Sequence, residues 1–441
     1  MQTTTLGYEI LNLTIESIDG KNGIDIRFIF DEINIFENVM LPCMSGNIVI
    51  HDAIGLSTKL NFDGSEYIRI NITKDDKTLG RQFDMNFDRR FVIYKLSNRK
   101  EVNQNSEIYT LHFVSDEFIL SQQKKVRKNY KDTHDKMIMS ILKEYLNLKF
   151  ETPQIGSIFP TSGVHELNIP NLSPFDAINY ITKRAIGPSG RPDYLFWQTP
   201  LAGYNFMPLS EILTFDAPHT ITFGAKNLPV QTKEKQFFSE LYGARDLKII
   251  SQYNYSENIQ AGVYAGKFIG FDTITRKIKT HNLSYSNVYN MEPNHANEYP
   301  HNNKILNKEY NTADTMYDSR VTLYPFQTNR ANNSYLLTND TRSTQNIDDT
   351  EKYILQRKMI LSNLMQRKLN ISMPGNFQYV AGSMIELLVP KRNNIDKDEY
   401  TDGDKTLSGK YLITGLRHVI KFDKHETLLE VVTDSTNYGA R

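Results

Sequence analysis

Residues 91–96 read FVIYKL and residues 411–416 read YLITGL, so similar strand-like stretches stand near both ends of the chain. Two more pairs of stretches match in the same order: DGSEYIRI at 63–70 with AGSMIELL at 381–388, and LHFVSD at 111–116 with LEVVTD at 429–434. Short β-sequences resemble one another easily, so no single match carries weight. The shared order does, and it predicts a β-domain that is present twice.

The spacing of the matched stretches supports this duplication. Gly64 and Val92 are 28 positions apart, and Gly382 and Leu412 are 30 apart. Three copies of a chain with two similar domains would present six similar units around a threefold axis. The repeat therefore predicts a protein that works by assembling with copies of itself and with neighbours.

The first 120 residues predict a β-domain. Apolar or alternating stretches bounded by turn residues are expected to form strands at Ile24–Phe30, Ile48–Ile50, Tyr67–Ile72, Phe91–Tyr94 and Tyr109–Val114. No helical period is visible in this region, which favours an antiparallel barrel or a sandwich.

A change of period predicts a small α+β insert over residues 121–220. Apolar residues at helical spacing over 137–146 indicate an amphipathic helix. Ser173 and Pro174 fit the N-cap and first position of a second helix, which Gly187 is expected to end.

Two other stretches of the insert have their own signatures. Tyr194–Trp197 reads as a buried strand. The basic run at 124–131 fits either a solvated connector or a phosphate contact.

The stretch between Asn282 and Asn346 contains 14 Asn among 65 residues, with many Tyr and few aliphatic side chains. It is expected to form long surface loops. Strand-like residues at Leu247–Ile250 and a helix from about Thr350 to Lys368 flank it.

Taken together, the pattern predicts a mainly β (α+β) chain with two similar antiparallel β-barrels, an inserted α+β domain and long surface loops. The predicted parts are the first barrel (1–120), the α+β insert (121–220), strands of the second barrel (221–260), a β-containing Asn- and Tyr-rich insert (261–349), a helix with the second barrel (350–436) and a C-terminal tail (437–441).

Composition argues against several functional classes. The 51 basic and 51 acidic residues cancel, whereas nucleic-acid-binding proteins usually carry a basic excess. The single Cys43 excludes an internal disulfide and is expected to be a small buried residue. The chain shows no signal peptide at its start, and no apolar stretch long enough for a membrane span.

The known catalytic motifs are incomplete in this sequence. His165-Glu166 and His425-Glu426 each begin a zincin-like motif, but neither has a second His four residues after the first. The stretch GVYAGKF at 262–268 resembles a phosphate-binding loop, with one residue too few and Phe where a hydroxyl is needed.

Other candidate ligands are scattered. His295 and His301 are expected to be solvated side chains, because no acidic or Cys cluster accompanies them. The acidic loop at 396–404 fits a polar hairpin turn better than a Ca²⁺ site. We therefore expect no catalytic, cofactor-binding or metal-binding residues, although a carboxylate pair separated in sequence would escape detection.

Several stretches resemble the central baseplate hub proteins of T-even-type contractile-tailed bacteriophages. They are SGNIVIHD (45–52) and LNFDGSEYI (60–68) for a first barrel, NIPNLSPF (168–175) for an inserted domain, and PGNF (374–377), VAGS (380–383), GKYLI (409–413) and TLLEV (427–431) for a second barrel. The inserted domain also resembles the base of type VI secretion spike proteins. The Asn- and Tyr-rich region departs from the family pattern.

The resemblance implies a structural role without enzymatic activity or cofactor. The chain would form a homotrimer in the virion tail baseplate after synthesis in the host cytoplasm. Its implied partners are the hexameric tail tube protein, the trimeric central spike, and other baseplate proteins such as wedge or tape-measure proteins, with DNA only in transit through the lumen.

Three alternatives follow from the same sequence. A hub of a phage-derived injection device would look alike. A tail-associated cell-wall hydrolase would need a catalytic constellation, and an oligonucleotide-binding barrel would bind DNA in a salt-sensitive manner.

Overall fold

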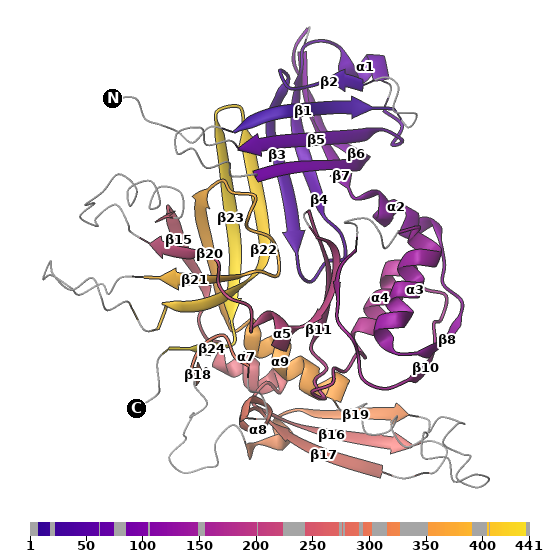
Figure 1. Ribbon diagram of the computed structural model, residues 1–441, viewed down its shortest axis with the longest axis vertical. Helices are drawn as coiled ribbons and strands as arrows, with labels where there is room; N and C mark the ends of the chain where they lie inside the picture. Colours follow the sequence, from indigo (N-terminus) through magenta and orange to yellow (C-terminus); the bar gives the residue numbers. More distant parts are fainter. Residues whose placement is uncertain are drawn as a thin grey trace, which may run out of the picture.

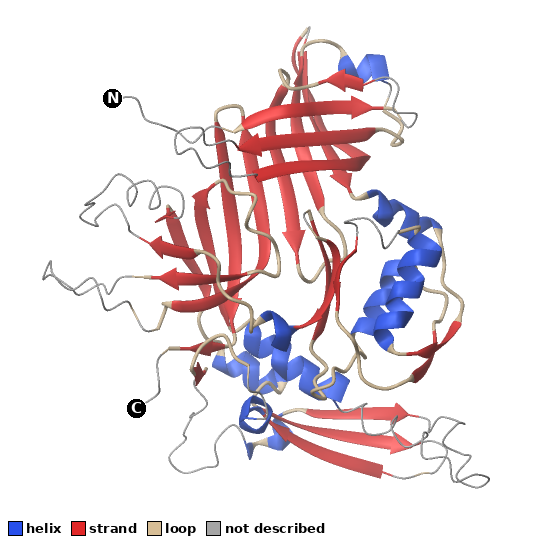
Figure 2. Cartoon of the chain, viewed as in Figure 1, coloured by secondary structure: helices blue, strands red, loops and turns tan. Residues whose placement is uncertain are grey.

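The fold was determined as a computed structural model (Figure 1). The residues it describes are 8–17, 23–60, 62–74, 85–104, 106–148, 155–200, 202–223, 243–272, 276, 278–290, 294–301, 315–326, 352–389, 404 and 406–437. Strands make up 49% and helices 21%, so the prediction of a mainly β chain is confirmed. Figure 2 shows one large sheet, smaller groups of strands beside and below it, and most of the helices at its side and lower end.

Strands from both ends of the chain form one fourteen-stranded sheet. The first β-region contributes β1 (Glu9–Glu16), β2 (Gly23–Asp25), β3 (Phe30–Asn38), β4 (Ser45–Asp52), β5 (Tyr67–Lys74), β6 (Met85–Asn103) and β7 (Ser106–Val114). The second β-region contributes β13 (Thr220–Phe223), β14 (Gly243–Ala244), β15 (Asp246–Ser251), β20 (Arg367–Pro374), β21 (Met384–Leu388), β22 (Gly409–Lys421) and β23 (Lys424–Thr433).

The two β-regions meet where β3 pairs with β22, which lie side by side in Figure 1. Among the described residues the structure shows no closed barrel, so the prediction of two separate barrels is not confirmed. β13 also departs from an antiparallel barrel, because it runs parallel to both β14 and β21.

Each β-region has its own apolar core. In the first, alternation along β3 turns Ile33 and Ile35 inward, while Glu32 takes the opposite face. In the second, Leu369 and Ile413 lie in a separate buried cluster. Two independent cores are what a duplicated domain requires.

The predicted strand at Ile24–Phe30 is wrong in its extent. Asp25 ends β2, residues 27–29 form a turn, and β3 begins at Phe30. The Asp25 carboxylate accepts hydrogen bonds from the Arg27 backbone N–H and guanidinium. This local bonding competes with strand pairing and bends the chain.

The insert packs helices against a small sheet beside the first β-region. It contains α2 (Asp116–Gln123), β8 (Asn129–Asp132), α3 (His134–Leu146), β9 (Ile155–Ile158), β10 (His165–Asn168), α4 (Pro174–Thr182), β11 (Tyr194–Thr199), β12 (Gly203–Pro208) and α5 (Leu209–Ile212). Another short helix, α1 (Leu56–Leu60), belongs to the first β-region.

The helices predicted in the insert are confirmed. α3 buries Met137, Ile141 and Leu142. The Ser173 hydroxyl caps α4 by accepting the Asp176 N–H at 3.3 Å. α4 ends at Thr182 rather than at Gly187. After Thr182 the backbone forms turns in which an N–H bonds to the carbonyl three residues earlier, instead of four as in an α-helix.

The remaining elements lie at the far end of the second β-region, in orange and pink in Figure 1. They are α7 (Tyr255–Ala261), β16 (Ala265–Asp272), β17 (Ile278–Ser284), α8 (Tyr285–Asn290), β18 (Tyr299–Pro300), η4 (Tyr317–Ser319), β19 (Val321–Phe326), η7 (Lys352–Gln356), α9 (Arg357–Leu364) and β24 (Ser435–Thr436).

Two sequence predictions for this part need correction. Residues 321–326, expected to be a surface loop, form β19, which pairs parallel to β16. The helix predicted to reach Lys368 ends at Leu364, since Arg367 already begins β20. No helix among the described residues has the length and apolar composition that a membrane span needs.

Candidate assembly interface

The sheet contains two sets of four strands with the same arrangement. The first quartet is β3, β4, β7 and β6 in spatial order, and the second is β15, β20, β23 and β22. Every neighbouring pair within both quartets is antiparallel. In each quartet the strand that comes last along the chain lies third in space, and the one before it lies fourth. The β3–β22 pairing joins the quartets into a run of eight strands.

The register of the matched strands is also the same. In the first quartet Ile93 lies opposite Phe113, and the strand bulges before Lys95. In the second, Ile413 lies opposite Val431, and the bulge falls before Gly415. These positions are the ones aligned by the sequence repeat. A shared bulge in a shared register is evidence of duplication, because bulges are specific features of a fold.

A fifth strand extends the likeness. β5 pairs with β6, and β21 pairs with β22, both antiparallel. Each is preceded by a glycine in the left-handed region: φ is +91° at Gly64 and +90° at Gly382. Ile93 and Ile413 both donate a backbone hydrogen bond of 2.9 Å to the residue that precedes the fifth strand.

The junction between the quartets has charged side chains on its solvated face. Glu32 of β3 forms ion pairs of 3.2 Å with both Arg417 and Lys421 of β22. Asn34 accepts a 2.8 Å hydrogen bond from Arg417. These neighbours lower the pKa of the Glu32 carboxyl against the opposing effect of burial. The pairs are partly exposed, so each contributes about 0.5 kcal/mol.

The other face of the junction has a buried acid, Glu37, which is 2% exposed. Its Oε2 accepts the Ala381 N–H at 3.2 Å, which ties β3 to the loop before β21. Burial raises the pKa of Glu37 to about 8. The carboxyl is therefore neutral at pH 7, which removes most of the cost of burying it.

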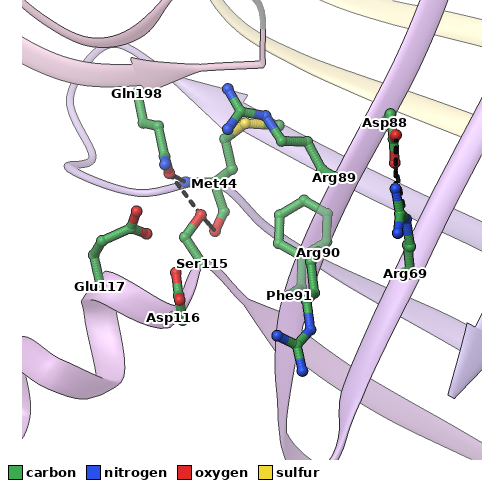
Figure 3. Close-up of a pocket in the computed structure, with 10 residues that line it drawn as sticks. All are labelled: Met44, Arg69, Asp88, Arg89, Arg90, Phe91, Ser115, Asp116, Glu117 and Gln198. Atoms are coloured by element: carbon green, nitrogen blue, oxygen red, sulfur yellow. Dashed lines mark hydrogen bonds and ion pairs between the residues drawn. The ribbon is translucent and has the colours of Figure 1, made fainter. Parts of the chain in front are cut away.

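Gln198 of β11 attaches the insert to the first β-region, as the dashed lines in Figure 3 show. Its Oε1 accepts the Met44 N–H at 2.9 Å and the Ser115 hydroxyl at 2.6 Å. Arg89 of β6 donates to the Pro200 carbonyl at 3.0 Å from Nε. The polar groups between the two parts are thereby satisfied.

A pocket of about 320 Å³ opens beside these contacts (Figure 3). Arg69 and Asp88, which line it, pair at 3.1 Å. Glu117 points toward the pocket from α2, and burial, followed by the neighbouring Asp116, raises its pKa. The acidic and basic groups that line the pocket form no recognisable catalytic set.

The two zincin-like motifs lie on strands and serve packing. His165 stacks on His134 at 4.3 Å, and Glu166 accepts a hydrogen bond from Asn129. His425 Nε2 lies 3.2 Å from His418 Nδ1, near the boundary between the two β-regions. Glu426 pairs with Lys424 at 2.6 Å.

The remaining candidate motifs are also structural. Gly262 ends α7 at φ +74°, and Phe268 is buried on β16. Cys43 is buried as predicted, with its sulfur 3.6 Å from the Tyr204 hydroxyl. Burial raises the pKa of the Cys43 thiol, which makes it a poor nucleophile.

The prediction that His295 and His301 are solvated is wrong. His295 forms a 2.8 Å contact with Asp434 and stacks on Tyr289. His301 is 3% exposed and contacts the Thr433 carbonyl at 2.7 Å. Both dock their segment onto the end of β23, a tertiary contact that local sequence does not reveal.

The acidic loop at 396–404 lies outside the described residues except Asp404. No group of three or more His, Cys, Asp or Glu within the described part of the chain could hold a metal ion. The basic run at 124–131 lies within the insert, where Lys128 forms an exposed ion pair with Glu144 of α3 at 3.0 Å.

Sequence reasoning missed the other half of each quartet. Through the pairings with β7 and β23, Asn47 and Ile48 on β4 correspond to Asn370 and Ile371 on β20. The only sequence signal is this shared Asn-Ile, which is too short to be recognised. β3 and β15 correspond only because they pair at matching positions with β4 and β20.

Neither protein-family models nor curated proteins match this chain. Two solved structures resemble it over nearly its whole length. A tail protein from Neisseria meningitidis MC58 matches with a TM-score of 0.52 at 11% identity, covering 97% of both chains. The 43 kDa tail protein of prophage MuSo2 from Shewanella oneidensis matches with a TM-score of 0.52 at 7% identity, covering 98% of this chain and 100% of the other. The fold is therefore that of phage tail proteins, in agreement with the resemblance seen in the sequence.

Proposed function

We propose that this chain is the structural hub of a contractile phage tail, a trimeric adaptor between a hexameric tail tube and a trimeric central spike. The observation that supports this most is the pair of quartets with one strand order, one register and one bulge. The fold shared with tail proteins supports the same class of function.

The physical argument rests on symmetry. A tube with six subunits per ring and a spike with three cannot share one set of identical contacts. A chain that contains two similar β-regions solves this mismatch, because three copies present six similar faces on one side. On the other side the two β-regions of each copy differ, so the faces alternate around the ring and the arrangement is threefold. A closed ring also stops heterologous contacts from growing without limit.

The solvated face of the eight-stranded run fits the wall of a DNA passage. Some of its basic groups are held by carboxylates: Arg417 by Glu32 at 3.2 Å, and Lys424 by Glu426 at 2.6 Å. Neutralised charges of this kind leave few free cations to grip phosphate groups. We propose that this face lines the lumen, so that DNA passes without being trapped.

The location and partners follow from the proposed role. The chain would reside in the tail baseplate of the virion after synthesis in the host cytoplasm. It would contact the tube protein, the spike protein and other baseplate proteins such as wedge or tape-measure proteins. A hub of a phage-derived injection device would use the same faces.

The proposed role is structural, so no hydrolytic activity is expected. A zymogram on peptidoglycan tests this directly, and we expect no cleared zone from the purified chain. Clearing that disappears on replacing one acidic residue would identify a wall hydrolase instead.

Size-exclusion chromatography with light scattering tests the assembly itself. We expect a particle three times the chain mass of 51.0 kDa at high protein concentration. We also expect no retention on DNA at physiological salt. A chain that stays monomeric at every concentration, alone and with tube and spike proteins, would overturn the proposal.

A further inference from the structure

We infer that residues 294–301 form a pH-sensitive latch, which one charged and one neutral histidine hold on the second β-region. The latch belongs to the Asn- and Tyr-rich region and docks onto the end of β23 and onto the short strand β24. Acid is expected to release it by charging His301. The device lies within a single chain, so it does not depend on the proposed hub role.

Backbone and amide contacts fix the latch in one position. Its strand β18 pairs antiparallel with β24. The Asn297 side chain binds β22 twice, because its Oδ1 accepts the Lys410 N–H at 2.8 Å and its Nδ2 donates to the Lys410 carbonyl at 3.0 Å. A Cβ on Gly409 would lie 2.4 Å from Asn297 Oδ1. Glycine at 409 therefore makes room for the latch.

The charge of His295 follows from its two hydrogen-bond partners. Its Nδ1 lies 2.8 Å from Asp434 Oδ2, and its Nε2 lies 3.1 Å from the Tyr289 carbonyl oxygen. A carbonyl oxygen and an ionised carboxylate can only accept, so both ring nitrogens must carry a hydrogen. His295 is therefore an imidazolium. Its stacking on the Tyr289 ring, with centroids 3.6 Å apart, suits a cation.

The carboxyl of Asp434 is ionised although it is buried. Burial raises its pKa, but the contacts with His295, Ser435 and Ala296 together hold the pKa below its usual value. The Ser435 hydroxyl donates to Oδ1 at 2.7 Å, and the Ala296 N–H donates to it at 3.1 Å. The buried guanidinium of Arg191, in the loop before β11, adds a favourable charge. A buried ion pair thus fastens the first half of the latch.

His301 fastens the other half as a neutral ring. It is 3% exposed, and its Nε2 donates to the Thr433 carbonyl at 2.7 Å, which requires one N–H. Burial lowers the pKa of His301 to about 4, and Arg367 of β20 acts in the same direction. The Thr433 carbonyl and Asp434 act against it. A second proton on His301 would therefore place a cation in a buried site that already holds Arg367.

The docked latch consequently loses stability in one direction of pH. A solvated His has a pKa of about 6.5. The contribution of His301 is complete above that value and is lost as pH falls from 6.5 towards 4. At pH 5 the ratio of released to docked latch should be about 30-fold higher than at pH 7.5.

The matching end of the first β-region is covered in a different way. Thr433 and Asp434 correspond to Ser115 and Asp116 in the sequence repeat. There the Ser115 hydroxyl donates to Gln198 at 2.6 Å, and Asp116 begins α2. The chain itself therefore continues from that end into the insert. At the end of β23 the cover arrives from a distant segment and is held by side-chain contacts, which titration can undo.

Hydrogen exchange of the full chain at pH 7.5 and pH 5 tests the latch. Each rate is divided by the intrinsic rate at the same pH, so that only the opening of the latch is compared. The amides of Ala296 and Asn297 report it directly, because they donate to Asp434 and to the Ser435 hydroxyl. Their protection should fall about 30-fold at pH 5.

Two variants separate the two histidines. His301→Gln keeps an N–H donor that does not titrate, so the latch should stay protected at pH 5. His295→Gln removes the cation beside Asp434, so protection at pH 7.5 should fall roughly tenfold or more, with the acid dependence retained. His51→Gln, at an exposed histidine of β4, is the matched control and should behave like the unmodified chain.

Three results would overturn the inference. One is protection in the unmodified chain that stays within about threefold between pH 7.5 and pH 5, which needs no variant to fold. Another is a His301→Gln chain that loses protection in acid as the unmodified chain does. The third is unchanged protection at pH 7.5 in His295→Gln.

Discussion

The two quartets share their strand order and register, yet their surroundings differ. Gly64 and Gly382 have the same backbone conformation, but a Cβ on Gly64 would lie 4.0 Å from its nearest neighbour, the Ile93 carbonyl oxygen, whereas a Cβ on Gly382 would lie 2.5 Å from the Trp197 ring. Trp197 also donates a 2.9 Å hydrogen bond to the Ala381 carbonyl. The two quartets therefore share their strand pairing but differ at this turn. In the second quartet the insert packs against the turn through Trp197.

The glycine pair gives the largest expected effect. Alanine at either position must adopt a positive φ, which costs about 1–2 kcal/mol. At Gly382 it also strikes the Trp197 ring, which adds about 1–3 kcal/mol of overpacking. We expect Gly382→Ala to lower the free energy of unfolding by about 2–5 kcal/mol and Gly64→Ala by about 1–2 kcal/mol, measured by urea unfolding.

A second experiment isolates the contribution of the Trp197 side chain. In the Trp197→Phe background the smaller ring leaves more room, so Gly382→Ala should approach the cost of Gly64→Ala. Equal costs of the two glycine substitutions in the unmodified chain would show that Trp197 does not crowd the turn at Gly382, and would contradict the difference between the two turns.

The next largest effect is expected at Glu37, which makes the free energy of unfolding depend on pH. Its pKa of about 8 lies above the ordinary Glu value of 4.5, so the folded chain holds a proton that the unfolded chain releases. Stability from this group is complete below about pH 4.5 and falls as pH rises through 8. Glu37→Gln should remove this dependence and make the chain more stable at pH 9 by up to roughly 5 kcal/mol, at about 1.4 kcal/mol per pKa unit.

The corresponding position in the second quartet is Gln252, one residue beyond β15, so this substitution makes the first quartet more like the second. Thermal unfolding of both chains from pH 5 to pH 9 measures the effect. Parallel curves for the two chains across that range would contradict the assignment of Glu37 as the source.

The smallest effect compares Glu32 with the corresponding Asp246. Glu32 pairs with Arg417 and Lys421 across the internal junction, whereas Asp246 lies on β15, the outermost strand of the second quartet, and is exposed. Glu32→Gln should cost about 0.5–1 kcal/mol in the monomer, and Asp246→Asn should cost almost nothing. Added salt should narrow the difference, because exposed ion pairs are screened.

A reversed order would weaken the correspondence between the two edges. If Asp246→Asn destabilised the dilute monomer more than Glu32→Gln, the β15 edge would already be engaged within one chain.

Sequence could predict the likeness of the two β-regions because three strands in each keep their apolar order. The FVIYKL and YLITGL stretches lie on β6 and β22 and keep even the bulge. β3 and β15 could not be matched, because a strand needs only an apolar inward face and its other positions diverge freely. The parallel pairing of β13 with β21 is likewise a tertiary choice that no local pattern encodes.

The candidate interface was less predictable than the fold. Strand edges are defined by what fails to pair, and pairing is invisible in a single sequence. The burial of His295 and His301 was mispredicted for a related reason, since their partners Asp434 and Thr433 lie more than 130 positions away. Helix caps such as Ser173 were predictable because their contacts are local.

Electron-microscope class averages of the purified oligomer, viewed down its axis, test the central claim most directly. The duplication of the two quartets predicts a closed ring of six similar lobes around an opening, with alternate lobes distinguished by their attached insert. A ring of three lobes, in which the two β-regions of each copy take unrelated positions relative to the axis, would contradict it.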